Sequence, residues 1–196
     1  NYFTKLKVTQ SLVEKTLGMT DLPLLSEPNL QQQLVEIGYQ GKKLEELEGL
    51  SATEKANMLF IVQDPYTSYY DAKVVRDFIA LTQKLGFSPI LLPFKPNGKA
   101  MHIKGFLVRF SKTAKTQAEF LNRVAKLNVP LVGVDPAIVL SYRDEYKEAL
   151  GDSRGDFHVL TAHEWLTNQL ESNALQSAVK NIAKSDCTFE WHLFPH

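Results

Sequence analysis

The sequence LVGVDPAIVLSYRDEY, residues 131–146, follows the same pattern as LFIVQDPYTSYYDA, residues 59–72. Each stretch begins with an apolar run that stops at an Asp-Pro pair, and each continues with a Ser-Tyr pair and an aspartate. A short continuous apolar run is typical of a strand buried on both faces of a sheet. Asp-Pro then favours the start of a helix, because Asp caps helix N-termini and Pro fits the first helical position. The two stretches therefore predict two related strand–helix halves.

The same alternation of strands and helices continues along the chain. Short apolar or alternating runs predict five strands, at residues 58–62, 89–92, 131–134, 157–160 and 187–194. Between these strands, apolar residues at helical spacing predict helices at residues 72–85, 114–128, 136–150, 161–171 and 172–185. The helix at residues 161–171 opens with a Thr-x-x-Glu capping box. This order indicates an α/β fold with a mostly parallel sheet of about four to five strands and helices on both faces.

The first part of the chain has a different pattern. Residues 5–18 have helical spacing, and the polar stretch that follows is interrupted by glycines. We therefore expect a helical N-terminal arm or linker at residues 1–56 and the α/β domain at residues 57–196.

Composition excludes several classes of function. The chain has 22 Lys and Arg against 22 Asp and Glu, so its net charge predicts no nucleic-acid partner. No apolar run approaches the roughly 18 residues of a transmembrane helix, and the first residues lack a signal-peptide core. One cysteine, Cys187, forms neither an internal disulfide nor a cysteine metal cluster. A cytoplasmic location is the default expectation.

A basic segment follows the second predicted strand. Between residues 95 and 118 the chain has no acidic residue, but it has six basic ones: Lys95, Lys99, Lys104, Arg109, Lys112 and Lys115. One interpretation is an anionic partner, such as a carboxylate, a phosphate or an anionic cluster. The other is an ordinary solvated helix face, and the sequence favours neither.

The candidate site lies at one edge of the predicted sheet. Ligands of parallel sheets bind beyond the carboxyl ends of the strands. Six side chains from that edge are predicted to line a crevice: Asp64, Asn97, Lys99, His102, Asp135 and Arg143. A simpler interpretation of each aspartate is that it only caps a helix. The sequence predicts no catalytic residue, because it has no nucleophile elbow, and no metal ligand, because its five histidines lack metal-binding spacing.

Residues 60–106 and 128–151 resemble the C-terminal part of large bacterial oxidoreductases that depend on FAD and iron–sulfur clusters. These are flavoproteins of the D-lactate and D-2-hydroxyglutarate dehydrogenase type. The resemblance runs from about residue 15, through LGMTDLPLLS, to the final FEWHLFPH.

The resemblance implies a domain order and a function. In that family an FAD-linked oxidase domain comes first and a ferredoxin-like domain second. The third part is similar to the cysteine-rich CCG domain of heterodisulfide reductases, which has two similar halves. The chain would then be a fragment of a dehydrogenase that oxidises a D-2-hydroxy acid. Its partners would be the FAD and ferredoxin-like domains of the same parent and an electron acceptor.

The chain departs from the CCG pattern at the positions where cysteines bind an iron–sulfur centre. These positions read Gln63-Asp64-Pro65, Pro96-Asn97-Gly98 and Val134-Asp135-Pro136. No cluster ligand or FAD-binding motif carries over, so we expect a piece that is truncated before the remaining cysteines, without cofactor and inactive alone. FAD and the iron–sulfur cluster would belong to the parent.

Three functions fit these observations. The first is a CCG-like domain that supports electron transfer or domain docking in the parent. The second is a docking module that has lost its metal. The third is an independent small α/β enzyme that binds an anionic ligand.

Overall fold

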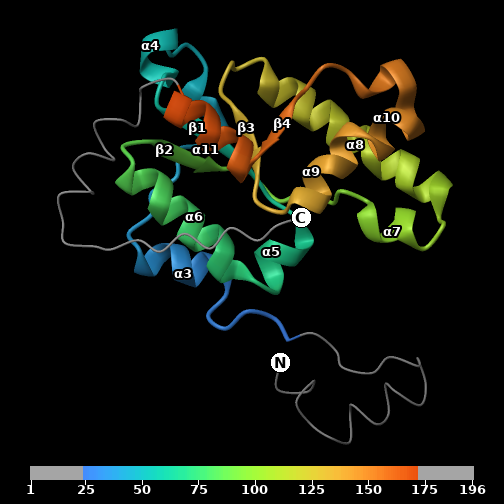
Figure 1. Cartoon of the computed structure of the whole chain (residues 1–196), viewed down its shortest axis with the longest axis horizontal. Helices are drawn as coiled ribbons and strands as arrows, with labels where there is room; N and C mark the ends of the chain where they lie inside the picture. The colour runs from blue at the N-terminus through green and yellow to red at the C-terminus, as the bar shows by residue number, and fades with distance from the viewer. Residues whose placement is uncertain (1–23, 172–196) are drawn as a thin grey trace, which may run out of the picture.

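A computed structural model describes residues 24–171, which form a four-stranded parallel sheet with helices on both faces (Figure 1). The strand order is β2-β1-β3-β4, and every neighbouring pair is parallel. At the centre, Phe60 is opposite Ile90 on one side and Leu131 on the other. The strands are β1 (Met58–Val62), β2 (Ser88–Leu91), β3 (Leu131–Gly133) and β4 (Val159–Thr161).

Nine α-helices and two short 3₁₀ helices are found in the described part of the chain. The α-helices are α3 (Leu30–Glu36), α4 (Ala52–Lys55), α5 (Pro65–Tyr69), α6 (Ala72–Lys84), α7 (Lys99–Ile103), α8 (Leu107–Ala125), α9 (Pro136–Arg143), α10 (Glu145–Leu150) and α11 (Ala162–Glu171). The 3₁₀ helices are η1 (Leu44–Leu47) and η2 (Gly151–Arg154).

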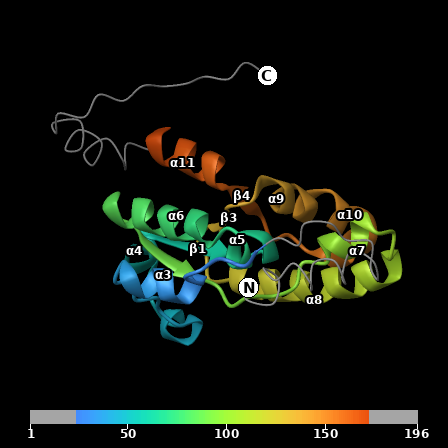
Figure 2. The same ribbon diagram turned by 90° about the horizontal axis from the view of Figure 1, so that it is seen from below.

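The side chains of β1 alternate between two apolar cores. Phe60 belongs to the core under α8, α9 and α10, whereas Leu59 and Ile61 belong to the core under α3, α6 and α11. Figure 2 shows α6 and α8 on opposite sides of the strands. All three side chains are fully buried, and each contributes about 1.5–3 kcal/mol to stability by leaving water.

Most of the elements predicted from local patterns are present. The first strand has the predicted bounds, and β2, β3 and β4 each lie within two residues of theirs. The predicted helix at residues 136–150 is two helices that are divided at Asp144, and α8 begins seven residues before the predicted residue 114. The predicted helices at residues 5–18 and 172–185 and the strand at residues 187–194 lie outside the described residues.

The two Asp-Pro stretches build similar units. In the first, β1 is followed by α5 and α6; in the second, β3 is followed by α9 and α10. Asp64 and Asp135 are the N-cap residues of α5 and α9. The second aspartates of the repeat, Asp71 and Asp144, occupy the N-cap positions of α6 and α10. The repeated sequence thus corresponds to a repeated strand–helix–helix arrangement.

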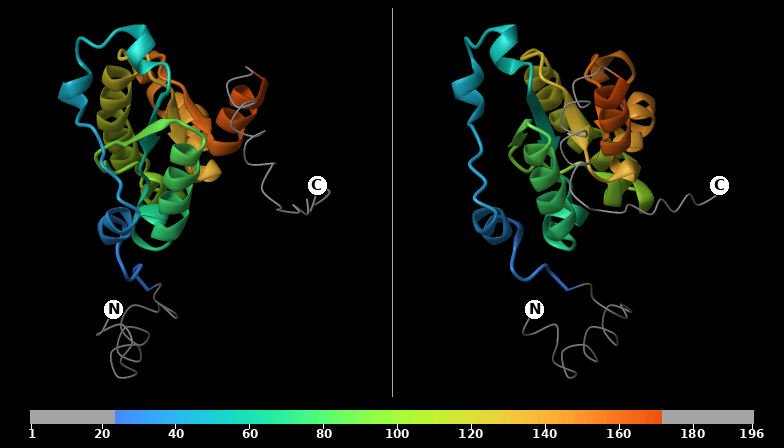
Figure 3. Two further views of the ribbon diagram at one scale, coloured as in Figure 1. Left: turned by 90° about the vertical axis from the view of Figure 1, so that its left-hand side faces the viewer. Right: turned by 60° about the vertical axis from the view of Figure 1, so that its left-hand side comes forward.

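The described part of the predicted arm, residues 24–56, packs along the outside of the domain (Figure 3). Leu34 on α3 is buried in the core with α6, and Leu47 on η1 is buried in the opposite core. The hydroxyl of Tyr39 accepts a hydrogen bond from the Leu91 N–H at 2.8 Å. These contacts tie the segment to the sheet. The division of the chain at residue 57 stays a prediction.

None of the helices between residues 24 and 171 is long and apolar enough to cross a membrane.

Candidate functional site

The carboxyl ends of β1 and β3 meet at the switch point of the sheet. The chain leaves β1 towards β2 on one side, and it leaves β3 towards β4 on the other. At such a point the connections diverge, and the crevice between them is where open α/β sheets bind ligands. Asp64 follows β1 and Asp135 follows β3, so both Asp-Pro pairs lie at this point.

The Asp64 carboxylate is occupied by its own helix. It accepts hydrogen bonds from the N–H groups of Tyr66 at 2.8 Å and Thr67 at 2.9 Å, and from the Thr67 hydroxyl. The residue is only 2% exposed. These contacts confirm the capping interpretation for Asp64 and leave it little capacity to bind a ligand.

Asp135 makes fewer capping hydrogen bonds than Asp64. Its side chain accepts the Ala137 N–H at 2.8 Å, which confirms a capping role here as well. Asp135 is only partly buried. Of the two aspartates it is therefore the better placed to face a ligand, and that role stays a prediction.

The loop after β2 holds Asn97 beneath the surface. Asn97 is 4% exposed, and its side-chain oxygen accepts the Lys99 N–H at 3.0 Å. Its carbonyl oxygen accepts the Tyr146 hydroxyl at 2.7 Å. The next residue, Gly98, has a φ of 78°, and a Cβ there would lie 2.9 Å from the Phe110 ring. Both the turn and the close approach require glycine, which fixes where Asn97 lies.

Tyr142 is the centre of the buried polar side chains at this edge. It is 1% exposed, and burial raises the pKa of its hydroxyl. The side chains of Gln117 and Asn97 oppose that rise, whereas the charges of Asp64 and Asp135 add to it. Although they are near one another, the Tyr142 hydroxyl, Gln117 Oε1 and Asn97 Nδ2 make no hydrogen bond of good geometry within the described structure. Tyr142 therefore stays neutral, and the charges of two of the six predicted residues, Asp64 and Asp135, act on its hydroxyl.

Lys99 and His102 face a common carboxylate that the sequence did not single out. Lys99 Nζ pairs with Glu145 Oε1, and His102 Nδ1 lies 3.9 Å from the same oxygen. Burial acts to raise the pKa of Glu145, but the Lys99 hydrogen bond, the nearby Ser141 hydroxyl and the Lys99 and His102 charges together hold it below its ordinary value. Glu145 is thus an anion at neutral pH, and its charge is largely neutralised by Lys99.

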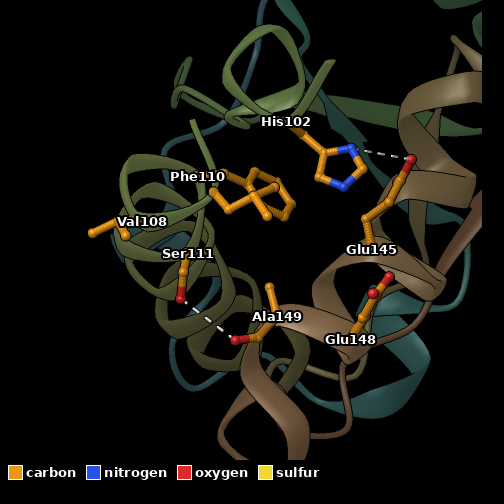
Figure 4. Close-up of a pocket in the computed structure, with 8 residues that line it drawn as sticks. His102, Val108, Phe110, Ser111, Glu145, Glu148 and Ala149 are labelled. Atoms are coloured by element: carbon orange, nitrogen blue, oxygen red, sulfur yellow. Dashed lines mark hydrogen bonds and ion pairs between the residues drawn. The ribbon is translucent and has the colours of Figure 1, made fainter. Parts of the chain in front are cut away.

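A hollow of about 470 Å³ lies beside this ion pair, between α7, α8 and α10. Figure 4 shows side chains from all three helices around it, with His102 and Glu145 on its rim. Its lining is partly apolar and partly polar: His102, Leu107, Val108, Phe110, Ser111, Glu145, Glu148 and Ala149. The hollow has the size of a ligand or side-chain pocket.

Arg143 has a different place. Its guanidinium donates to Glu164 Oε1 at 2.9 Å and to the Val159 carbonyl at 2.8 Å, and so joins α9 to β4 and α11. The pKa of Glu164 is lowered to about 2, mainly by the hydrogen bond from Arg143 and next by the hydrogen bond from the Thr161 N–H. The structure therefore brings Lys99 and His102 together at Glu145, whereas Asp64 and Asp135 cap their own helices and Arg143 pairs with Glu164.

Three residues of this region were missed from the sequence. Glu145 and Tyr142 lie in the stretch SYRDEY, residues 141–146. The repeat drew attention to this stretch, but nothing in it indicated the roles of these two side chains. Gln117 lies on the buried face of α8 between Ala114 and Leu121, and a polar residue on an apolar face was the available signal.

The donor set at this edge does not fit an iron–sulfur centre. Among residues 24–171 no three His, Cys, Asp or Glu side chains are grouped so that they could hold a metal ion. The strand ends present Gln63, Asp64 and Asp135, whereas such clusters are held by cysteine thiolates. Cys187 lies outside the described residues.

The chain is similar to proteins named D-2-hydroxyglutarate dehydrogenase. All 196 residues match such a protein from Haemophilus influenzae at 81% identity, one from Escherichia coli at 56% and one from Pantoea ananatis at 52%. The chain spans only 18–19% of the length of these relatives. No family model matches the chain. No solved structure matches it either.

Proposed function

We propose that this chain is a docking domain of a larger FAD-linked dehydrogenase that oxidises D-2-hydroxyglutarate. The observation that carries the proposal is the identity of 81% over all 196 residues to a protein of that name. Because the chain spans about a fifth of that relative, the activity would belong to the whole polypeptide.

The arrangement of the described side chains supports a docking role over a catalytic one. Asp64 and Asp135 accept helix N–H groups, and Glu145 is paired with Lys99. Burial keeps Tyr142 protonated, so it offers no base. A general base works best when its pKa lies near the operating pH, and the pKa of Glu145 is held below its ordinary value. The chemistry would come from the FAD of the parent, bound by residues outside the described ones.

Electron transfer is the second candidate role, and the observation that favours it is the pair of similar units that meet at the switch point. Two such halves are what the resemblance to CCG domains implies. The test is iron and acid-labile sulfide per chain, measured anaerobically on this chain and on the parent. Iron in the parent alone would place the ligands outside these residues and support electron transfer. Two iron-free samples would contradict it and favour docking.

An independent enzyme that binds an anion is less well supported. Such a site would need available cations at the strand edge, but Lys99 is neutralised by Glu145 and Arg143 by Glu164.

A metabolic measurement tests the proposed substrate. Cells that lack the gene of the parent should accumulate D-2-hydroxyglutarate and not the L-enantiomer, as measured by chiral mass spectrometry. Restoring the gene should remove the excess. Unchanged D-2-hydroxyglutarate in the deleted strain would contradict the proposal.

A further inference from the structure

The corner where α7 meets α8 exposes a group of large apolar side chains. Its members are Ile103, Phe106, Leu107 and Val108, which are 73%, 52%, 58% and 87% exposed. Val108 and Ile103 are the most exposed large apolar residues between residues 24 and 171. Apolar patches of this kind, rimmed by polar residues, mark interaction surfaces. Below, this group of four residues is called the α7–α8 corner.

The hollow beside the corner gives it a shape that a partner can fill. Leu107 and Val108 belong both to the corner and to the lining of the hollow, and Phe110 and Ala149 continue the apolar wall inwards. Figure 4 shows Val108 at the outer end of this wall and Glu148 on the opposite side. An apolar side chain that enters the hollow would cover the wall, and its flanking residues would cover the corner.

The charges around the corner call for an acidic partner. Lys104, Arg109 and Lys112 are exposed, and none of them has an acidic partner among the described residues. The N-terminus of α8 adds to this field through the helix dipole, because Phe106 at the N-cap provides no side-chain cap. The Leu107 N–H itself donates to the Gly105 carbonyl at 2.9 Å. A carboxylate placed here would meet three cations and a helix N-terminus.

The same features argue against a lipid surface. Glu148, an exposed residue, lines the hollow without a cationic partner among residues 24–171, and its carboxylate would repel anionic headgroups. A flat membrane also leaves a concave hollow unfilled. A protein segment that has an apolar anchor between acidic residues fits both the shape and the charge.

We propose that the α7–α8 corner is the surface through which this domain binds the rest of its parent polypeptide. The occupant is an acidic segment of that polypeptide, outside these 196 residues, whose apolar side chain enters the hollow. The inference rests on the proposed function, in which about four-fifths of the relatives' length lies outside the matched region.

Hydroxyl-radical footprinting tests this docking directly. The oxidation of Phe106 and Leu107 is measured in this chain and in the intact parent, with Leu81 on α6 as the reference because it is 42% exposed and remote in the sequence. We expect several-fold less oxidation of both corner residues in the parent and an unchanged Leu81. Equal oxidation of the corner in the two samples would overturn the proposal.

Two matched variants give a second readout in the parent. Val108→Glu places a carboxylate at the corner, and Val35→Glu does the same on α3, where Val35 is 68% exposed. Both positions are surface, so neither variant should impair folding of the domain. In the parent, Val108→Glu should restore the oxidation of Phe106, and Val35→Glu should not. Continued protection in both variants would overturn the proposal.

Other occupants give their own results. Binding of this chain to vesicles of anionic phospholipid, with the corner unprotected in the parent, would overturn the proposal in favour of a membrane. Concentration-dependent protection in this chain alone would overturn it in favour of a second copy. The footprint does not depend on turnover, so a parent that protects the corner but leaves D-2-hydroxyglutarate unoxidised would refute the proposed substrate and not the docking.

Discussion

Lys99 on α7 and Glu145 on α10 form an ion pair that joins two helices 46 residues apart in the sequence. Their side chains are 24% and 21% exposed, so the pair is neither fully solvated nor fully buried. Glu145 also lines the hollow, and the pair joins α7 to α10.

Loss of the ion pair should destabilise the chain. Lys99→Met leaves Glu145 partly buried and without its cation, and we expect the free energy of unfolding to fall by about 1–2 kcal/mol, between the values for exposed and buried pairs. Urea denaturation measures the loss. Lys112→Met is the matched control, because Lys112 is exposed and has no acidic partner in the described structure. Equal losses in the two variants would show that the ion pair contributes no stability.

The contribution of Glu145 should depend on pH. Its pKa is lower in the folded chain than its ordinary value of 4.5, so the stabilisation is fully present above that value and is lost as the pH falls through the folded pKa. The difference in unfolding free energy between the wild type and Glu145→Gln should therefore shrink below about pH 4.5. Urea titrations from pH 7 to pH 3 measure it, and a constant difference would contradict the lowered pKa.

The two capping aspartates should differ in their effect on stability. Asp64→Ala removes three hydrogen bonds from a buried carboxylate and should cost about 2 kcal/mol, the upper end for a helix cap. Asp135→Ala removes one from a partly exposed carboxylate and should cost about 0.5–1 kcal/mol. Thermal and urea unfolding of the two variants test the order. A larger loss at Asp135 would be the contradictory outcome.

Gly133 should tolerate no side chain while Val139 is present. A Cβ at Gly133 would clash with Val139 Cγ2, so Gly133→Ala forces β3 and α9 apart. We expect a loss of about 1–3 kcal/mol, as for other overpacked cores. In the double variant with Val139→Ala, the change at Gly133 should cost less than it does in the wild-type background, as a double-mutant cycle would measure. Additive losses would contradict this account of the glycine.

The strands and helix caps could be predicted because their signals are local. The continuous apolar run of β1 and the capping box from Thr161 to Glu164 are each contained in a few residues. The bounds of α8 were harder, because Leu107 and Val108 are exposed and break the apolar periodicity that a helix prediction follows. The break between α9 and α10 at Asp144 could not be predicted, because no glycine or proline marks it in the sequence.

The candidate site was less predictable because its geometry depends on long-range contacts. The order of strands and helices was enough to place Asp64 and Asp135 at the carboxyl ends of two strands, where the structure has them. It could not show that Lys99 pairs with Glu145, since that contact joins distant helices. Nor could it show that Arg143, so close in sequence to Tyr142, turns towards Glu164. Which of the six residues meets a ligand stays a prediction.

The most direct test of the central claim is whether the purified parent polypeptide oxidises D-2-hydroxyglutarate. The rate is measured from the reduction of an artificial electron acceptor. We predict turnover of the D-enantiomer and not of the L-enantiomer by the parent, and no turnover by this 196-residue chain alone. A parent that oxidises neither enantiomer, or activity in the isolated chain, would contradict the account.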